Sequence, residues 1–311
     1  MSSLSAALES NMSEDDGITY EIAAPHVARI TLNRPRTRNA QDTRFLYALN
    51  DGFERATRDN EVKVIILAAD GPHFSSGHDV FEADNSIERL QNAMRNHRTV
   101  TTAGGFERGG AEGYMAREEE IYVGFCERWR SIPKPTIAQV HGRCIAGGLM
   151  LVWPCDLVMA SDDAQFLDNT VDMGVGGVEL FQHAWEFGIR KAKELLFTAD
   201  WLSAQEAQRL GMVNHVVPRA ELVERTLQLA QRIARKPTFA LKLAKEALNA
   251  SQDAQGRKEA LHIAFGLHQL AHWHNHALFG SIVDPTFYRE TMKKKPGEAR
   301  TEPAKAAGEG S

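Results

Sequence analysis

The sequence predicts an α/β fold followed by a helical C-terminal region. Three observations lead to this prediction. Apolar segments of strand length alternate with amphipathic segments in the first half of the chain. Two of the strand-like segments run directly into glycine-rich turns. After about residue 220 the apolar residues recur only at helical spacing. Because the chain has 311 residues, no internal repeat and no clear linker, we expect one domain.

The first half of the chain supplies strands and helices in turn. Val27–Leu32 alternates in polarity and predicts the first structured element, a strand that Pro35 ends. Asp42 begins a predicted helix whose apolar residues follow at helical spacing. Val62–Ala69 is nearly all apolar and rich in β-branched residues, which is typical of a strand covered on both faces. Residues 82–120 are polar and weakly periodic, so we expect a mobile segment with broken helices.

The rest of the chain is expected to turn from strands to helices. The predicted elements are a short helix over 121–131, strands over 136–140 and 157–160, a buried helix from 149 onward, and amphipathic helices over 221–235, 239–249 and 253–278. Residues 1–17 and 293–311 are expected to be flexible tails. They flank one domain of residues 18–292, whose α/β core extends to about residue 220.

Composition excludes several classes of partner. The chain has 36 Lys and Arg against 41 Asp and Glu, a formal charge of −5, which argues against nucleic acid. Its three cysteines are too few and too scattered for a disulfide framework or a zinc ribbon. No stretch approaches the roughly 18 apolar residues of a membrane span, and no segment has the pattern of a secretory signal. We therefore expect a cytoplasmic protein in a reducing compartment, with no membrane partner.

Two glycine-rich turns are the first candidates for function. Phe74–Asp79 and Ile145–Gly148 each follow an apolar strand. Glycines at such junctions let backbone N–H groups face a ligand, and the start of a helix adds a favourable dipole. Two N–H groups that converge on one oxygen would form an oxyanion hole. The alternative is that both are only tight turns beside closely packed helices.

These turns belong to a longer set of motifs that resembles the enoyl-CoA hydratase/isomerase (crotonase) family. The matching pieces are Asn33-Arg34-Pro35 with Asn39-Ala40, Phe74–Asp79, Lys134–Gly142, Ala146-Gly147-Gly148, Cys155–Ser161, Ala164-Gln165-Phe166 and Gly211–Pro218. They occur in the order and at the spacing of the family over about residues 20 to 275, which makes the resemblance far more specific than any single motif.

The resemblance implies a crotonase-like ββα spiral core with a helical trimerisation region after it. It also implies an acyl-CoA thioester substrate, a homotrimer or dimer of trimers, and no cofactor beyond the coenzyme A portion of the substrate. By position, the backbone N–H groups of His78 and Gly147 would hold the thioester oxygen and stabilise an enolate. The other substrate-binding positions implied are Arg34, Ser76, Gly77, Asp79, Ala146, Gly148, Met150 and Thr170. The 82–120 segment would border the acyl pocket.

Arginines after the first strand are candidates for the coenzyme A phosphates. Arg34 and Arg36 offer the positive charge that phosphate recognition requires. The alternative for each is an exposed surface arginine with no ligand.

Two departures from the family pattern affect the chemistry. Hydratases of this family use two glutamates to hold, deprotonate and reprotonate one water. Met150 and Thr170 stand at the two positions here, and neither side chain can act as an acid or base at neutral pH. Enoyl-CoA hydration remains the reaction expected from the family. The alternatives are isomerisation or acyl-CoA hydrolysis with a relocated acid, and a homologue that binds acyl-CoA without catalysis.

Three nearby acids are candidates for the missing groups. Asp168 and Asp172 lie two residues on either side of position 170, and share its side of an extended segment. Glu179 follows two glycines at a predicted helix start, in a region where some family members place a catalytic acid. His183 lies one helical turn beyond Glu179 and could orient it for proton transfer. Each acid could equally be a solvated charge or a residue favoured by the helix dipole.

A histidine series near the C-terminus is also notable. His268, His272 and His276 recur every four residues, which aligns them on one helical face as in some zinc sites. No cysteine or carboxylate joins them in the sequence pattern, and the resemblance implies no metal. We therefore predict packing in a subunit interface or around the adenine pocket, and no metal site.

Overall fold

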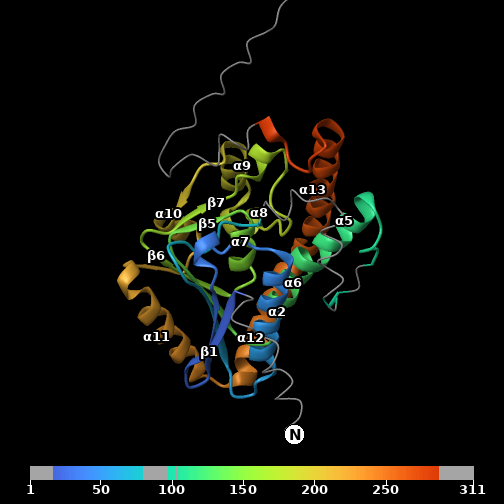
Figure 1. Cartoon of the computed structure of the whole chain (residues 1–311). Coiled ribbons are helices and arrows are strands. Elements are labelled where there is room, and N and C mark those ends of the chain that lie inside the picture. Colours follow the sequence, from blue (N-terminus) through green and yellow to red (C-terminus); the bar gives the residue numbers. More distant parts are fainter. Residues whose placement is uncertain (1–16, 80–96, 98, 102–103, 287–311) are drawn as a thin grey trace, which may run out of the picture.

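The computed structural model of the protein describes residues 17–79, 97, 99–101 and 104–286. These residues form a six-stranded sheet in the order β1-β2-β3-β4-β6-β9 and a three-stranded sheet in the order β5-β7-β8. The strands are β1 Ile18–Ala24, β2 Val27–Leu32, β3 Val64–Ala69, β4 Thr136–Val140, β5 Arg143–Ile145, β6 Leu157–Ser161, β7 Gln165–Leu167, β8 Leu202–Ser203 and β9 His215–Val217. The large sheet is parallel except for β1, which pairs antiparallel with β2 (Figure 1).

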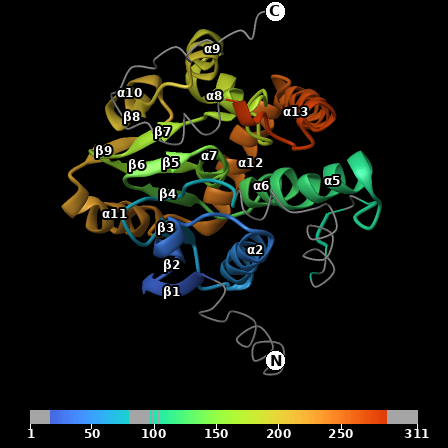
Figure 2. The same cartoon turned by 45° about the horizontal axis from the view of Figure 1, so that its top comes forward.

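The helices surround the two sheets. They are α2 Thr43–Arg58, α5 Gly110–Glu118, α6 Phe125–Arg130, α7 Gly147–Val152, α8 His183–Phe187, α9 Ile189–Thr198, α10 Ala204–Leu210, α11 Leu222–Ala234, α12 Thr238–Ala254 and α13 Arg257–Phe279. A π-helical segment, η3 (Glu119–Gly124), joins α5 to α6 without a break, and short 3-10 turns occupy 35–37, 170–173 and 219–221. Helix α13 lies beside α5, far from it in sequence (Figures 1 and 2).

Successive turns of the chain repeat one arrangement, which is what places the two glycine turns together. Strand β4 of the large sheet leads to β5 of the small sheet and then to α7, and β6 leads in the same way to β7. The segment after β3 extends the small sheet through a parallel bridge between Ser75 and Cys144. The Ile145 N–H donates to the Ser75 carbonyl at 3.0 Å. The turns that follow β3 and β5 therefore run side by side.

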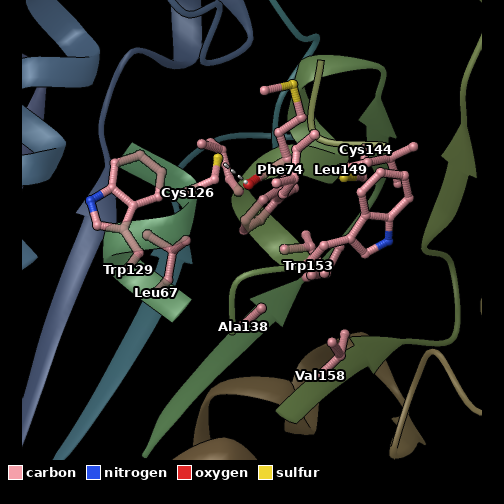
Figure 3. Close-up of a cluster of buried hydrophobic side chains, with 14 of the residues drawn as sticks. Leu67, Phe74, Cys126, Trp129, Ala138, Cys144, Leu149, Trp153 and Val158 are labelled. Atoms are coloured by element: carbon pink, nitrogen blue, oxygen red, sulfur yellow. Dashed lines mark hydrogen bonds between the residues drawn. The ribbon is translucent and has the colours of Figure 1, made fainter. Parts of the chain in front are cut away.

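The large sheet is covered on both faces, as the apolar composition of β3 predicts. Val64 and Ile66 pack in a cluster with α11, whereas Ile65 and Leu67 face the main core with α2, α6 and α7. All six residues of β3 are buried. Figure 3 shows part of the main core, in which Trp129, Phe74 and Trp153 belong to the same buried cluster as Leu149 of α7. Burial on both faces is the reason that the strand lacks alternation.

Several elements agree with the sequence prediction. The strands over 27–32 and 136–140 have the predicted bounds, and β6 extends one residue beyond its prediction. Helix α2 begins at Thr43, where the Asp42 carboxylate caps it by accepting the Phe45 N–H at 2.7 Å. The long C-terminal helices are present, but the boundary predicted at 253 is wrong. Helix α12 runs to Ala254, and Gly256, with φ +88°, separates it from α13.

The prediction that Val27 begins the first structured element is wrong. Strand β1 precedes it, and its burial pattern shows no alternation because only Ile18 is fully buried. The short strands β5, β7, β8 and β9 and the helices α9 and α10 were also not predicted. Strands of two or three residues are too short to display a period.

The prediction of broken helices over residues 82–120 is wrong from Gly110 onward, whereas the described residues of this range before Gly110 contain no helix. Residues 80–96, 98 and 102–103 lie outside the described residues. Helix α5 runs through the π-helical segment into α6 as one unbroken helical stretch from Gly110 to Arg130. Its periodicity is weak because Arg117, Glu118 and Glu120 are buried, so charged residues stand at inward positions. The predicted tails also lie outside the described residues, apart from Gly17.

Two compositional predictions can be compared with the described residues. None of their helices is both long enough and apolar enough to cross a membrane. Cys126, Cys144 and Cys155, all within the described part of the chain, form no disulfide.

Candidate active site

The two glycine turns meet at the backbone of residues 77 and 147. Gly77 has φ +90°, and a Cβ atom there would lie 2.8 Å from the Ile145 carbonyl oxygen and 3.2 Å from the Gly147 nitrogen. A Cβ on Gly147 would lie 2.6 Å from Cε1 of the His78 ring. Glycine is therefore required at position 77, where a side chain would separate the backbones of the two turns, whereas a side chain at position 147 would displace the His78 ring. The sequence predicted this proximity only through the family resemblance.

The residue before Gly147 has an unusual backbone. Ala146 adopts φ +45° and ψ −109°, a conformation that a residue with a Cβ rarely adopts. It is the N-cap of α7, so the N–H of Gly147 belongs to the first turn and has no acceptor within the helix. The strained residue thus sets the direction of an N–H group that is available to a ligand.

Asn39 anchors the Phe74–Asp79 turn. Its side-chain amide donates to the carbonyls of Asp70, His73 and Phe74 at 3.0, 3.2 and 3.0 Å. Its Oδ1 atom accepts the N–H of Arg34 at 2.8 Å. The residue is completely buried, which explains the structural purpose of an asparagine in this motif.

A cavity of about 440 Å³ opens beside the two turns. The predicted site residues that line it are Ser76, His78, Asp79, Ala146, Thr170 and Glu179. Gly77, Gly147 and Gly148 form the backbone next to these residues and let the two turns approach each other. Arg34, Met150, Asp168 and Asp172 do not line this cavity.

Glu179 is the candidate acid that the structure places beside the two glycine turns. Its Oε2 atom lies 3.1 Å from Nε2 of His78, whose ring stacks on Tyr122 at 4.0 Å between centroids. Its Oε1 atom lies 3.4 Å from Nε2 of His268. Burial raises the pKa of Glu179, but the His78 and His268 imidazoles outweigh it and hold the pKa well below its usual range. The carboxylate is therefore ionised at neutral pH.

Asp168 has a different environment from Glu179. Its Oδ1 atom accepts the N–H and hydroxyl of Thr170 at 2.9 and 2.6 Å. Its Oδ2 atom accepts the Val178 N–H at 3.1 Å and lies 2.7 Å from Nε2 of His183. Burial raises the pKa of Asp168, but these hydrogen bonds lower it overall. With four partners, this buried carboxylate holds the 168–183 segment together.

His183 therefore does not orient Glu179, as the spacing of the two residues predicted. It pairs with Asp168 and is almost completely buried. The helix that begins at His183 starts after Glu179, so the two residues do not share a helical face. Asp172 is half-buried in the 3-10 turn at 170–173, away from the cavity.

Three further cavity residues were not among the predicted site residues. Glu118 of α5 lies 3.6 Å from Nε2 of His268 and 3.7 Å from Nε2 of His272, both on α13. All three are buried. Burial lowers the pKa of His268, but Glu179 and Glu118 raise it to about 9 overall, whereas burial lowers the pKa of His272. The sequence showed the histidine spacing, but their carboxylate partners come from distant segments. His276 is exposed and lies outside this group.

The remaining predicted residues occupy structural or peripheral positions. Met150 is buried in the main core. Arg34 donates to the Asp42 carboxylate at 2.5 Å and lies over the Phe45 ring, so its charge is already paired within the protein. Arg36 and Arg38 are exposed and line the cavity, which makes them better placed than Arg34 to meet a phosphate.

Comparisons with known proteins identify the family of this chain. The sequence model of the enoyl-CoA hydratase/isomerase family matches residues 23–101 and 104–292. EchA13 of Mycobacterium tuberculosis, named as a candidate enoyl-CoA hydratase, is 45% identical over 272 residues, which cover 87% of this chain and 84% of that protein. A crystal structure of a probable enoyl-CoA hydratase from Mycobacterium smegmatis matches with a TM-score of 0.76 and 46% identity over 86% of this chain and 99% of that one. A second structure, of a probable enoyl-CoA hydratase from Mycobacterium thermoresistibile, matches with a TM-score of 0.75 and 43% identity over the same shares.

The family match spans both glycine turns and the cavity beside them, and the structural matches extend over most of the fold. The chain therefore belongs to the enoyl-CoA hydratase/isomerase family and has its crotonase fold, with a helical C-terminal region.

Proposed function

We propose that this protein hydrates an enoyl-CoA thioester with two relocated carboxylates, Glu179 and Glu118. The observation that supports the proposal is that both are buried and line the cavity beside the two glycine turns, whose N–H groups are the proposed oxyanion hole. They compensate for Met150 and Thr170, which stand where the family pattern has its two glutamates.

The oxyanion turns provide the first part of the proposed reaction. The N–H groups of His78 and Gly147 would donate to the thioester oxygen, where negative charge develops as the enolate forms. The dipole of α7 adds to this effect because Gly147 is its first residue. These donors are held in place by the packed turns, so they need no reorganisation during the reaction.

The carboxylates provide the second part. One takes a proton from a water while the water oxygen bonds to C3 of the enoyl group, and the double-bond electrons move toward the thioester oxygen. The protonated carboxyl group then gives this proton to C2 of the enolate, which restores the carboxylate and completes the addition of water across the double bond. Glu179 is the base in this scheme because it is ionised and lies beside His78. Glu118 is the second group that contacts the water.

Double-bond isomerisation is the second candidate, favoured by one observation. Of the two carboxylates, Glu179 is the one that forms a hydrogen bond with His78, and isomerisation needs a single group that removes and returns a proton. Acyl-CoA hydrolysis and binding without turnover are the remaining alternatives. Hydrolysis would release coenzyme A, whereas binding without turnover would give no product.

We also propose which residues bind the coenzyme A portion of the substrate and how the chains assemble. Exposed Arg36 and Arg38 are suited to the coenzyme A phosphates, and the reaction needs no cofactor beyond coenzyme A itself. Helices α12 and α13 expose large apolar side chains at Phe239, Leu243, Leu248, Ile263, Leu267, Leu270 and Leu278. Such a surface favours the homotrimer or dimer of trimers that the family resemblance implies.

Mass spectrometry of thioesters incubated in heavy-oxygen, deuterated water tests the function. Heavy oxygen and deuterium added across the double bond would support hydration. Deuterium without oxygen would indicate isomerisation instead, and released coenzyme A would indicate hydrolysis. Tight binding with no product from any enoyl-CoA or acyl-CoA would contradict catalysis. The Glu179→Gln variant serves as the matched control, since it keeps the side-chain shape and removes the base.

A further inference from the structure

Four side chains converge in the wall of the cavity from three distant parts of the chain. They are Glu118 of α5, Glu179 before α8, and His268 and His272 of α13, and all are buried. One ligand atom from each lies within 4.8 Å of the corresponding atom of every other. Two imidazoles and two carboxylates form a donor set that suits a divalent transition metal.

The two imidazoles are oriented as metal ligands. Nδ1 of His268 lies 2.8 Å from the Gly177 carbonyl, and Nδ1 of His272 lies 2.7 Å from the Ile282 carbonyl. A carbonyl oxygen only accepts, so each Nδ1 must be the protonated nitrogen. The Nε2 atoms of both rings have no hydrogen-bond partner among the described residues. Both side chains are only about 5% exposed, so water does not readily supply the missing partner. Backbone contacts of this kind fix the ring and direct Nε2 at an ion.

Three separations within the group are close to those of ligands around one ion. Nε2 of His268 lies 3.4 Å from Glu179 and 3.6 Å from Glu118, and Nε2 of His272 lies 3.7 Å from Glu118. Hydrogen-bonded pairs would be closer, at about 2.7–3.2 Å. Ligands about 2.0–2.2 Å from a tetrahedral zinc ion are about 3.3–3.6 Å apart. All four ligand atoms lie within 4.8 Å of one another, so the pairs that are furthest apart must close by up to about 1.5 Å for the group to hold an ion.

The charge of the group also favours a cation. Glu118 and Glu179 bring two carboxylates into a buried site, which is costly unless positive charge compensates them. A divalent ion neutralises both. The amide of Gln269 donates to Oε2 of Glu118 at 2.5 Å and supports that ligand from behind. A proton on His268 is the competing source of positive charge.

We infer that Glu118, Glu179, His268 and His272 bind one divalent ion of the zinc class in the substrate-free protein. Four protein ligands complete a tetrahedral shell, so the ion has no open position for water. If the two carboxylates act on water as proposed above, the bound ion blocks turnover. This consequence rests on the proposed function, whereas the binding site does not.

Zinc titration of the tag-free, full-length protein tests the inference. The protein is stripped with a chelator, dialysed and titrated with zinc chloride by calorimetry, and its metal content is measured by mass spectrometry. We expect one zinc per chain, with a Kd on the order of 10⁻⁷ M or tighter. Magnesium should not compete, because it disfavours imidazole ligands. Cobalt should give the visible absorption of a tetrahedral site.

Variants distinguish this site from surface binding. His272→Gln should weaken zinc binding at least about tenfold and abolish the cobalt spectrum. Glu118→Gln, which keeps the side-chain shape, should do the same if His272→Gln disturbs the fold, as judged by circular dichroism and thermal melting. His276→Gln is the matched control, because it lies one turn further along α13 and is exposed. The His276→Gln variant should bind zinc as tightly as the wild type.

Other results would overturn the inference. They are an absence of zinc binding at about a thousand times the expected Kd, and binding that His272→Gln and Glu118→Gln leave intact. Turnover is measured separately with and without zinc. Zinc that binds at the site without slowing hydration would leave the site in place and contradict the proposed use of the carboxylates. Hydration by a protein that takes up no zinc would contradict the metal site alone.

Discussion

Nε2 of His78 lies 3.1 Å from Oε2 of Glu179, which joins the turn after β3 to the segment before α8. This contact brings a buried carboxylate to the turn whose backbone N–H is proposed to hold the thioester oxygen. His78 therefore has two relationships to the site: its backbone belongs to the proposed oxyanion hole, and its ring contacts Glu179, the proposed base.

Removing the base should stop turnover without removing the substrate site. Glu179→Gln is expected to lower kcat about 10²- to 10⁴-fold, the usual contribution of a general base. Binding of a saturated acyl-CoA, measured by calorimetry, should remain. Asp172→Asn is the control, because this half-buried acid does not line the cavity. Equal rates for wild type and Glu179→Gln would exclude this residue from the chemistry.

The contact between the two glycine turns predicts a sharp effect at residue 77. Gly77→Ala places a Cβ 2.8 Å from the Ile145 carbonyl at φ +90°, so the turns must separate. We expect a loss of about 1–3 kcal/mol in the free energy of unfolding and at least a tenfold loss of kcat. Denaturant unfolding and initial rates measure the two effects. Gly176→Ala, which faces open space, should be close to neutral; equal effects at both glycines would refute the packing argument.

Asp168 should contribute to stability in a pH-dependent way. Its folded-state pKa lies below the unfolded value, so its contribution is complete above about pH 4 and is lost as the pH falls through the folded-state pKa. Asp168→Asn is expected to cost about 3 kcal/mol at pH 7, because His183 and three further donors lose a charged acceptor. Denaturant unfolding at several pH values should show that the difference in free energy of unfolding between wild type and Asp168→Asn becomes smaller in acid. A constant difference between pH 7 and pH 2 would contradict this role.

Arg34 and Arg36 should differ in what their replacement changes: protein stability for Arg34 and substrate binding for Arg36. Arg36→Ala is expected to raise KM severalfold and weaken the salt dependence of acyl-CoA binding, because this exposed side chain lines the cavity. Arg34→Ala should instead lower the melting temperature, since it removes a partner of Asp42, the cap of α2. Titration with coenzyme A at two ionic strengths and thermal melting separate the two roles. A larger KM effect for Arg34→Ala would reverse the assignment.

The exposed apolar faces of the C-terminal helices predict an assembly. Sedimentation velocity should give the mass of a trimer or hexamer. Leu270→Glu, at a side chain that is 65% exposed in the single chain, should shift the mass toward the monomer. Ile22→Glu is the matched control, since Ile22 is an exposed apolar residue on β1. A monomeric wild-type protein would contradict the proposed assembly.

Much of the fold could be predicted from local pattern because local physics determines it. The alternation in Val27–Leu32, the apolar run ending at Ala69 and the Asp42 cap each specify an element without reference to distant residues. Very short strands such as β8 and the edge strand β1 could not be predicted, because pairing with a neighbour, and not a hydrophobic period, defines them.

The sequence alone predicted only part of the candidate site. It determined the family motifs, the two glycine turns and the absence of glutamates at positions 150 and 170. It also provided three candidate acids, with Glu179 ahead of Asp168 and Asp172, and only the tertiary structure showed the surroundings of each. Asp168 turned toward four donors, Asp172 stayed away from the cavity, and Glu179 met His78, which is 101 residues away in sequence.

The group formed by Glu118, Glu179, His268 and His272 was decided by tertiary structure in the same way. The sequence determined that His268 and His272 share a helical face. Only the packing of α13 beside α5 brings Glu118 to that face. Gln269 and Glu118, which touch in the fold, are 151 residues apart. The physical reason is that side-chain periodicity records what a segment buries, whereas chain folding over such separations decides which buried charges face one another.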